Sequence, residues 1–588
     1  MWVRENLRHI YMPLLLVLLV ALVGELLHIE QAPLIVHAEP ATTTPLKHII
    51  IILGENHTFD NIFGAYKPLK DQSIDNLLSK GIITSNGRLG PRAWLSRQHL
   101  AQNRKGYSLS PQQTGSYRTL PQPNTTYAKG LPRHIPDRRF PADLPNGPYQ
   151  ITRYVPYHNA IVGDPIHRFY QMWQQIDKGK NDLFTWVAQT AGRDNGAIPP
   201  LPVYQGAVSM GYYNMSTGDA PDFRFIADHY TISDNYHQSI MGGTGVNHIA
   251  IGTADMAFYT DSKGNPARPP AHQIENPNPK PGTNNNYTQD GYSGGSYSEC
   301  ANVRQPGVGP ILDYLHSLPY KAFRAGDCAP GSYYLLNNYK PAYTATGQRT
   351  TGTPFVVPPQ DMPTIANELS AHNISWKYYG QSLNNQHSSA HFCDICDPFQ
   401  YVTSIMHSRL KDNIQDFTRF QADVANDRLP AVSFIKPDSA NDGHAASSAL
   451  NKFETFSTQI VNEVMHKPAL FKQTAIIVTF DEGGGYYDSG YIQPLDFFGD
   501  GPRVPLMVIS PYARRGYVDH TYYDHTSLLK FIERNWRLHP LSARSFDNLP
   551  DPLMSRSNPY QPLNRPAIGD LMQLFDFQHP RHDTPLLP

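Results

Sequence analysis

The chain has 588 residues, with 49 Lys and Arg against 50 Asp and Glu. The resulting net charge of −1 provides no overall attraction to nucleic acids or anionic membranes. We therefore expect no nucleic-acid-binding surface, and any phosphate recognition must be local. The length allows one large α/β core with insertions, and no fixed-period repeat indicates a solenoid or a propeller.

The first 38 residues have the order of a secretory signal. Arg4 and Arg8 precede an uncharged stretch from Ile10 to Gly24, and small residues allow cleavage after Ala38. The alternative is an uncleaved membrane anchor, although the apolar stretch is shorter than the roughly 20 residues that span a bilayer. In both cases we expect the catalytic part to be secreted or to lie in the periplasm or cell envelope.

Apolar runs and helical patterns alternate along the rest of the chain. Strands are predicted at 49–53, 231–234, 374–379, 431–436, 475–480 and 505–510. Helical spacing of apolar residues occurs at 167–189, 360–372, 448–466 and 526–536. The run at 49–53 has no alternation, which is typical of a central strand buried on both faces. The pattern predicts an α/β fold with a central, doubly wound sheet and helices on both faces.

Proline and glycine are concentrated in three stretches, at about 91–156, 264–310 and 341–363. Predicted strands resume after each stretch, so we interpret them as long loop insertions in one catalytic domain, residues 39–550. Residues 551–588 are rich in proline and are expected to wrap on this domain as a C-terminal tail.

Four cysteines, at positions 300, 328, 393 and 396, suit an extracytoplasmic protein with up to two disulfides. The spacing Cys393-x-x-Cys396 also occurs in metal and redox sites. A structural zinc site normally has a second matched pair, which this chain lacks.

Polar residues follow three of the predicted strands directly. Glu55 and Asn56 follow the first strand, Asp442 and His444 come after the strand at 431–436, and Asp481, Glu482 and Asp488 follow the strand at 475–480. Ligands of such sheets gather at the carboxyl ends of the strands. Carboxylate oxygens with imidazole suit a divalent cation. The alternative is a set of solvated acidic loops, and His57 equally suits a helix start.

A glycine-rich turn, Gly242-Gly243-Thr244-Gly245, supplies a hydroxyl on tight backbone. A threonine hydroxyl is a weak nucleophile that a base or a metal must activate. Taken alone, this segment would be read as a glycine turn capped by Thr244. Together with the acidic strand ends, it indicates a nucleophile.

Eight segments resemble, in this order, a bacterial phosphoesterase family: "GENHTFDNIFG", "HRFYQMWQQIDKGKNDLF", "DNYHQSIMGGTGVNH", "CDICDPF", "KPDSANDGHAAS", "FDEGGGYYD", "PRVPLMVISPYARRG" and "DHTSLLKFIERNW". That family contains phosphatidylcholine-type phospholipases C and related acid phosphatases, within the alkaline-phosphatase superfamily. The resemblance extends from about residue 47 to 537. It implies an alkaline-phosphatase-like central sheet and a phosphoryl-transfer site with a divalent metal ion.

Site residues follow from the matching motif positions. The resemblance implies that Thr244 attacks phosphorus and that the metal site consists of Glu55, Asn56, Thr244, Asp481 and Glu482. It further implies that His444 and His167 lie at the phosphate or the leaving group. His387 is a third candidate, with His391 as its alternative, whereas His525 is expected to be structural.

Two departures from the phospholipase pattern favour the acid-phosphatase branch. Gly483 stands where phospholipase members usually have a histidine, and the nucleophile turn reads Gly-Gly-Thr-Gly rather than Gly-Pro-Thr. We therefore predict a phosphatase acting on phosphate esters. The alternative is a phospholipase C that cleaves phosphodiester lipids, and a non-catalytic cell-envelope binding protein is the alternative from another class.

Overall fold

An eight-stranded mixed sheet forms the centre of the computed structural model, which describes residues 40–190, 205–279, 293–323, 328–384 and 389–588. The predicted signal sequence lies outside these residues. In spatial order the strands are β11 (Ile414–Asp416), β10 (Trp376–Gly380), β12 (Val432–Lys436), β1 (His48–Gly54), β13 (Thr474–Phe480), β14 (Leu506–Ile509), β6 (Thr231–Ser233) and β15 (Tyr517–Asp519).

The direction of these strands brings several of their ends to one edge. All pairs from β11 to β13 are parallel, β14 is antiparallel to both of its neighbours, and β6 is parallel to β15. Consequently β1, β12, β13 and β6 end at the same edge, where β14 begins. The sheet is therefore mixed, and the six predicted strands all belong to it.

β1 is the central strand that its uninterrupted apolar run predicted. It pairs with β12 on one side and with β13 on the other. Its four isoleucines, Ile49 to Ile52, have no exposed surface. Burial on both faces explains why the run has no polar alternation.

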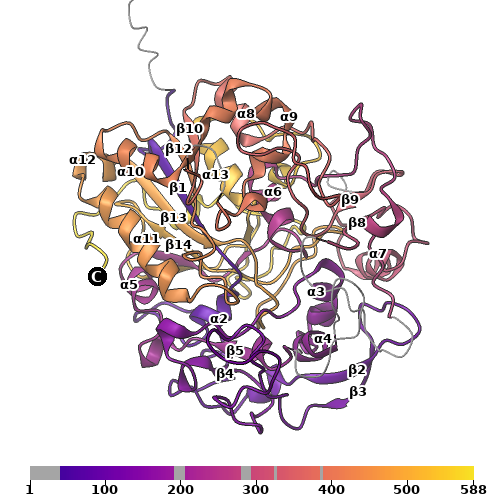
Figure 1. Cartoon of the computed structure of the whole chain (residues 1–588). Helices are drawn as coiled ribbons and strands as arrows, with labels where there is room; N and C mark the ends of the chain where they lie inside the picture. The colour runs from indigo at the N-terminus through magenta and orange to yellow at the C-terminus, as the bar shows by residue number, and fades with distance from the viewer. Residues whose placement is uncertain (1–39, 191–204, 280–292, 324–327, 385–388) are drawn as a thin grey trace, which may run out of the picture. The chain divides into compact units, whose positions relative to one another are not determined.

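Helices cover both faces of the sheet (Figure 1), which confirms the predicted α/β class. One group consists of α5 (Pro221–His229), α10 (Phe417–Ala425), α11 (Leu450–Met465) and α12 (Pro468–Phe471). The other contains α6 (Thr244–Thr253), α8 (Ile365–Ala371) and α13 (Ser527–Trp536). The Phe453 ring of α11 packs 5.0 Å from that of Phe480, beside Gly54, where a Cβ would lie 2.5 Å from the ring.

The helical pattern at 167–189 forms two helices rather than one. α3 (Phe169–Ile176) ends where Asp177 and Lys178 adopt positive φ angles of 39° and 58°, and α4 (Phe184–Thr190) starts after this turn. The predicted helix at 360–372 likewise starts only at Ile365, because the Thr364 side chain caps it.

Outside the main sheet, the remaining described strands are short and form pairs. Paired short strands are β2 (His99–Gln102) with β3 (Gln112–Ser116), β4 (Tyr149–Gln150) with β5 (Gly211–Tyr212), β7 (Tyr236–His237) with β16 (Tyr523–Asp524), and β8 (Tyr297–Ser298) with β9 (Tyr334–Leu335). The short helices are α2 (Phe59–Phe63), α7 (Val308–Ser317) and α9 (Thr403–Met406).

Two disulfides, Cys300–Cys328 and Cys393–Cys396, are present. Within the described ranges, no helix has the length and apolar character needed to cross a bilayer.

Candidate active site

The ends of β1 and β13 bring the predicted acidic residues together. Glu55 and Asn56 directly follow β1, while Asp481 and Glu482 directly follow β13, and all four are buried. Thr244, the first residue of α6, donates its hydroxyl to Glu55 Oε2 over 3.2 Å. The structure thus places the five predicted metal-site residues at one edge of the sheet.

The Glu55 carboxylate lies between the Thr244 hydroxyl and the buried ammonium group of Lys436. Lys436 Nζ, at the end of β12, is 3.0 Å from Glu55 Oε1, and Cys396 Sγ is 3.2 Å from the same oxygen. Burial raises the pKa of Glu55, but the charge of Lys436 and weaker effects of nearby histidines outweigh it, so the net shift is downward. Glu55 is therefore a charged acceptor for the Thr244 hydroxyl.

Two residues of this site, Lys436 and His248, were not among the site residues predicted from the sequence. Lys436 ends the apolar strand in "SFIKPD", and a lysine at the end of a buried strand was an available signal. His248 is four residues after Thr244 and therefore on the same face of α6. Its Nδ1 lies 3.8 Å from Asp481 Oδ2 and 3.0 Å from the Thr244 carbonyl.

The donors present fit a divalent cation. Single ligand atoms of Glu55, His248 and Asp481 all lie within 4.8 Å of one another. Asp481 Oδ2 and His248 Nε2 are buried and have no hydrogen-bond partner among the described residues. Burial, Glu55 and Glu482 raise the pKa of Asp481 well above its usual value. Buried carboxylates that repel one another, beside a neutral imidazole, are the environment that a bound cation would stabilise.

Glu482 faces His167, another predicted residue. His167 Nε2 is 3.3 Å from Glu482 Oε1, and the Gly484 N–H donates to Glu482 Oε2 over 3.1 Å. Gly484 has a φ of 59°, and a Cβ there would lie 2.8 Å from the Asn56 carbonyl oxygen. The glycine loop after β13 therefore passes against the segment after β1, as only glycine allows.

His444 lies at the solvent side of the site. Its Nδ1 accepts the Ala446 N–H over 3.1 Å, so a neutral imidazole has its proton on Nε2. The side-chain amide of Asn56 lies with its Nδ2 3.0 Å from His444 Nε2. If the two ends of this amide are exchanged, its oxygen accepts the Nε2 proton of His444. Unlike the acids, His444 is partly exposed, so a substrate entering the site would meet it.

The remaining histidines have different positions. His387 lies outside the described residues, so its predicted role is unassigned. His525 is buried, with Nδ1 2.9 Å from the Tyr236 hydroxyl and Nε2 bonded to the Asp481 carbonyl, which suits the structural role expected for it. His57 bonds Asn61 and the Gly443 carbonyl through its two nitrogens, so it holds backbone and side chains together.

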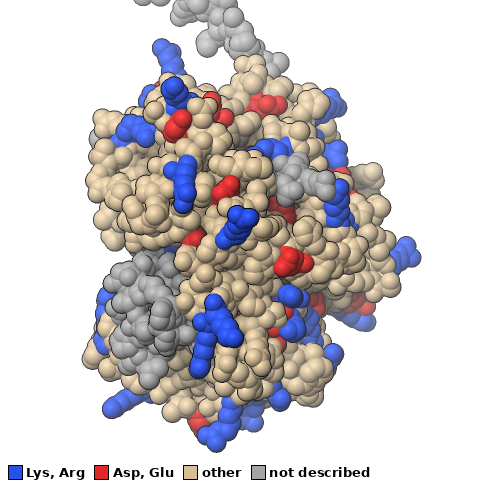
Figure 2. All heavy atoms as spheres, turned by 90° about the vertical axis from the view of Figure 1, so that its right-hand side faces the viewer, with Lys and Arg blue, Asp and Glu red and all other residues tan. Residues whose placement is uncertain are grey.

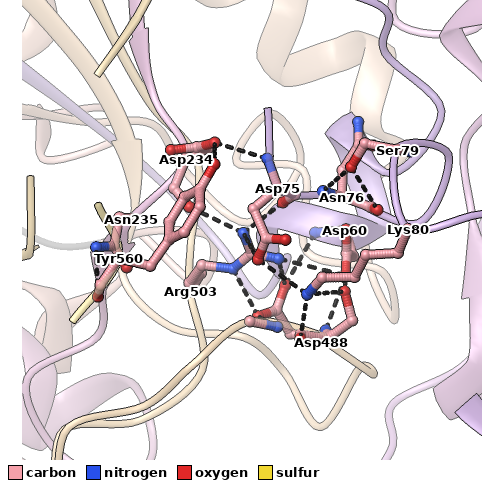
Figure 3. Close-up of polar contacts among 12 residues, drawn as sticks. Asp60, Asp75, Asn76, Ser79, Lys80, Asp234, Asn235, Asp488, Arg503 and Tyr560 are labelled. Atoms are coloured by element: carbon pink, nitrogen blue, oxygen red, sulfur yellow. Dashed lines mark hydrogen bonds and ion pairs between the residues drawn. The ribbon is translucent and has the colours of Figure 1, made fainter. Parts of the chain in front are cut away.

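Asp488, which also follows β13, is not in this site. It pairs with Arg503, which lies just before β14, through Nε to Oδ2 at 2.8 Å and Nη2 to Oδ1 at 3.1 Å. Figure 3 shows Asp488 and Asp60 on one side of Arg503 and Asp234 on the other. The guanidinium also donates to the carbonyls of Asp75 and Asp234, at 2.6 and 2.8 Å.

This buried cluster connects the two loops that carry the site acids. The Asp60 N–H donates to Asp488 Oδ1 over 3.2 Å, and the Thr58 hydroxyl donates to the Tyr487 carbonyl over 2.9 Å. Burial and the charge of Asp488 raise the pKa of Asp60 to about 6. The Arg503 cluster therefore anchors the segment after β1 to the glycine loop after β13.

Comparison with known proteins gives the family. Residues 46–539 match the model of the Phosphoesterase family. Non-hemolytic phospholipase C of Burkholderia pseudomallei is 24% identical over 93% of this chain and 61% of that protein. Phospholipase C B of Mycobacterium tuberculosis is 23% identical over 84% of this chain and 74% of its own length. A probable acid phosphatase of Kluyveromyces lactis is 25% identical over 33% of this chain and 46% of its own length.

Among solved structures, a protein in the alkaline phosphatase superfamily from Vibrio parahaemolyticus matches 53% of this chain and 59% of its own, with 9% identity and a TM-score of 0.24. The class indicated by the matched family model is that of phosphoesterases. The chain belongs to the Phosphoesterase family, because the family model matches most of its length. It spans about three fifths of the Burkholderia protein.

Proposed function

We propose that the chain is an extracytoplasmic, metal-dependent phosphoesterase with Thr244 as its nucleophile. The observation that carries the proposal is the Thr244 hydroxyl, which donates to charged Glu55 beside the unsatisfied carboxylate oxygen of Asp481. The signal-like order of the first 38 residues supports an extracytoplasmic location. Membership of the Phosphoesterase family supports the reaction class.

The residues of the site account for a two-step displacement. Thr244 Oγ1 attacks phosphorus and its proton passes to Glu55 Oε2, 3.2 Å away. The leaving oxygen departs with the bonding electron pair and takes a proton from water at the open side, where the Nε2–H of His444 can donate a hydrogen bond to it. Water then hydrolyses the phosphothreonine and restores the hydroxyl.

Positive charge matched to the phosphoryl oxygens is the main need of such a transition state. A divalent cation, when bound by Glu55, Asp481, Glu482 and His248, would supply Lewis acidity there. The Asn56 side chain, which contacts His444, would bind a phosphoryl oxygen. Lys436 keeps Glu55 charged through its contact at 3.0 Å. The Nε2 of His167 lies 3.3 Å from Glu482 Oε1, and it would donate to a non-bridging oxygen as an imidazolium, because the neutral ring has its proton on Nδ1, 2.7 Å from the Pro165 carbonyl.

The preferred substrate is a phosphomonoester, as in acid phosphatases. Gly483 is the supporting residue, because a Cβ at this position would lie 2.7 Å from Thr58 Cγ2, and its N–H donates to Gln238 Oε1 over 2.8 Å. A histidine side chain therefore does not fit here. Cleavage of phosphodiester lipids is the second candidate, since the relatives that match 84–93% of this chain are named phospholipase C.

The test compares hydrolysis of a chromogenic phosphomonoester with that of the matching phosphorylcholine diester, with and without a chelator. We expect monoester turnover that is lost on chelation and in Thr244→Ala, with Thr244→Ser as the control that keeps a hydroxyl. Turnover of the diester alone would favour phospholipase C. Full turnover by Thr244→Ala would refute the nucleophile, and no turnover with any divalent metal would favour a non-catalytic binding protein.

A further inference from the structure

One segment is strongly basic although the chain as a whole is nearly neutral. Residues 88–153, here called the basic segment, contain 11 Lys and Arg, two Asp and no Glu. The rest of the chain has 38 Lys and Arg against 48 Asp and Glu. Whole-chain neutrality therefore results from the cancellation of two oppositely charged parts, and the local field of the basic segment is positive.

The cations of the basic segment face solvent without acidic partners. Ten of the eleven are exposed, and the remaining one, Arg139, pairs with buried Asp137 at 2.6 Å. Within the described part of the chain, none of the ten exposed cations forms an ion pair. The lower end of the view in Figure 1 carries β2, β3 and β4, and Figure 2 shows Lys and Arg at that end with few acidic side chains.

Large apolar side chains project from the same segment. Trp94 is 61% exposed, Leu100 38%, Leu131 39% and Ile135 43%. They are four of the nine large apolar residues exposed in the described ranges, although the segment is a small part of the chain. Exposed tryptophan and aliphatic side chains among cations are typical of surfaces that enter the headgroup region of a bilayer.

Part of the basic segment lies at the rim of the candidate active site. Residues 125–136 form the rim loop, closed at its base because the Thr125 N–H donates to the Ile135 carbonyl over 2.9 Å. Lys129 Nζ donates to the Ser447 carbonyl over 2.6 Å, and the Ser447 N–H donates to the His444 carbonyl over 2.9 Å. The rim loop is thus hydrogen-bonded to the segment that presents His444 to solvent.

We propose that the basic segment is a docking surface for anionic lipid bilayers, with the rim loop bringing the open side of the site to the membrane. Charge favours an anionic partner, and the exposed tryptophan and aliphatic side chains favour a bilayer over a nucleic acid. Docking itself depends only on this surface. It does not depend on which ester the site cleaves.

The experiment measures cosedimentation of the purified full chain with phosphatidylcholine vesicles and with vesicles that also contain phosphatidylglycerol. The neutral vesicles report any binding that does not depend on charge. The charge variant carries Arg97→Glu and Arg133→Glu, both at exposed positions without ion pairs. The matched control carries Lys452→Glu and Lys472→Glu, which change the net charge equally on α11 and beside α12.

We expect the wild-type chain to prefer the anionic vesicles and the charge variant to bind them roughly 30-fold more weakly, because each of two cations contributes to attraction at the surface. The matched control should bind as the wild type does. Raising the ionic strength should weaken binding, since salt screens exposed charges. A second variant, Leu131→Ser with Ile135→Ser, should also bind more weakly.

Equal losses in the charge variant and the matched control would overturn the proposal, because net charge and not this surface would then control binding. Binding to duplex DNA without binding to anionic vesicles would also overturn it. Hydrolysis of a soluble phosphomonoester is measured separately on each variant and should be unchanged. The hydrolysis assay contains no vesicles, so it alone shows whether the proposed activity fails. The cosedimentation assay contains no substrate, so it alone shows whether docking fails.

Discussion

Glu454 is a buried carboxyl whose protonation links stability to pH. Its side chain accepts the N–H groups of Asp222 and Phe223 at the start of α5, each over 3.1 Å, and the Tyr157 hydroxyl. Burial raises its pKa to about 8 despite these hydrogen bonds. Between about pH 4.5 and pH 8 the unfolded chain releases this proton while the folded chain keeps it. The folded state therefore loses stability as pH rises through this range.

Glu454→Gln should remove this part of the pH dependence. The expected gain of the variant over the wild type grows by about 1.4 kcal/mol for each pH unit from about pH 5 to pH 8. Urea unfolding at pH 5, 6.5 and 8 measures it. Asp313→Asn, at an exposed position on α7, is the control and should give a constant difference. A constant difference for Glu454→Gln would show that this carboxyl is already ionised when folded.

At the scale of elements, the turn before α6 sets the position of the nucleophile. A Cβ on Gly242 would lie 2.1 Å from the Leu336 carbonyl oxygen and 2.7 Å from Val246 Cγ2. The Asn247 side chain also donates to the Gly242 carbonyl over 2.9 Å. The first glycine in "MGGTG" is therefore needed, because the backbone of Leu336 leaves no room for a side chain at this position.

Gly242→Ala should displace this turn and the Thr244 hydroxyl with it. Overpacking of this kind is expected to cost about 1–3 kcal/mol of unfolding free energy, and turnover should fall as well. Gly309→Ala in α7 is the control, since its Cβ would meet nothing nearer than 3.5 Å. Chemical unfolding and kcat are measured on both. Wild-type kcat in Gly242→Ala would mean that the turn adapts without moving the nucleophile.

The elements show why some predictions held and others did not. β1 was predictable because burial on both faces of a sheet demands an unbroken apolar run. α3 and α4 were not separable, because the apolar spacing continues through the turn at Asp177 and Lys178, whose left-handed backbone leaves no mark in hydrophobic periodicity. Asp488 follows the same predicted strand as Asp481, and only the position of Arg503 shows that it lies outside the site.

At the scale of the whole molecule, the C-terminal residues are built into the fold. Ile568 and Leu574 are fully buried, and Lys530 Nζ of α13 donates to the Ile568 carbonyl over 2.6 Å. Leu587 exchanges two hydrogen bonds of 2.9 Å with the Asn462 side chain of α11. The tail predicted from its proline content thus contributes to the core around two helices.

Ile568→Ala should therefore destabilise the whole protein. Removing a fully buried isoleucine side chain costs about 2–5 kcal/mol, seen as a lower unfolding midpoint. Leu563→Ala is the matched control, because that side chain is 70% exposed and its loss should change stability by less than about 0.5 kcal/mol. Equal effects in the two variants would mean that the tail folds apart from the core.

The sequence by itself determined six of the eight strands of the main sheet, the alternating α/β pattern and the candidates Glu55, Asn56, Thr244, Asp481 and Glu482. These are readable because burial imposes apolar runs and because polar residues directly after such runs must lie at a sheet edge. The contacts of Lys436 and His248, and the separation of Asp488 from the site, were decided only by tertiary structure. They depend on which strand ends lie side by side, and local spacing does not encode that neighbourhood.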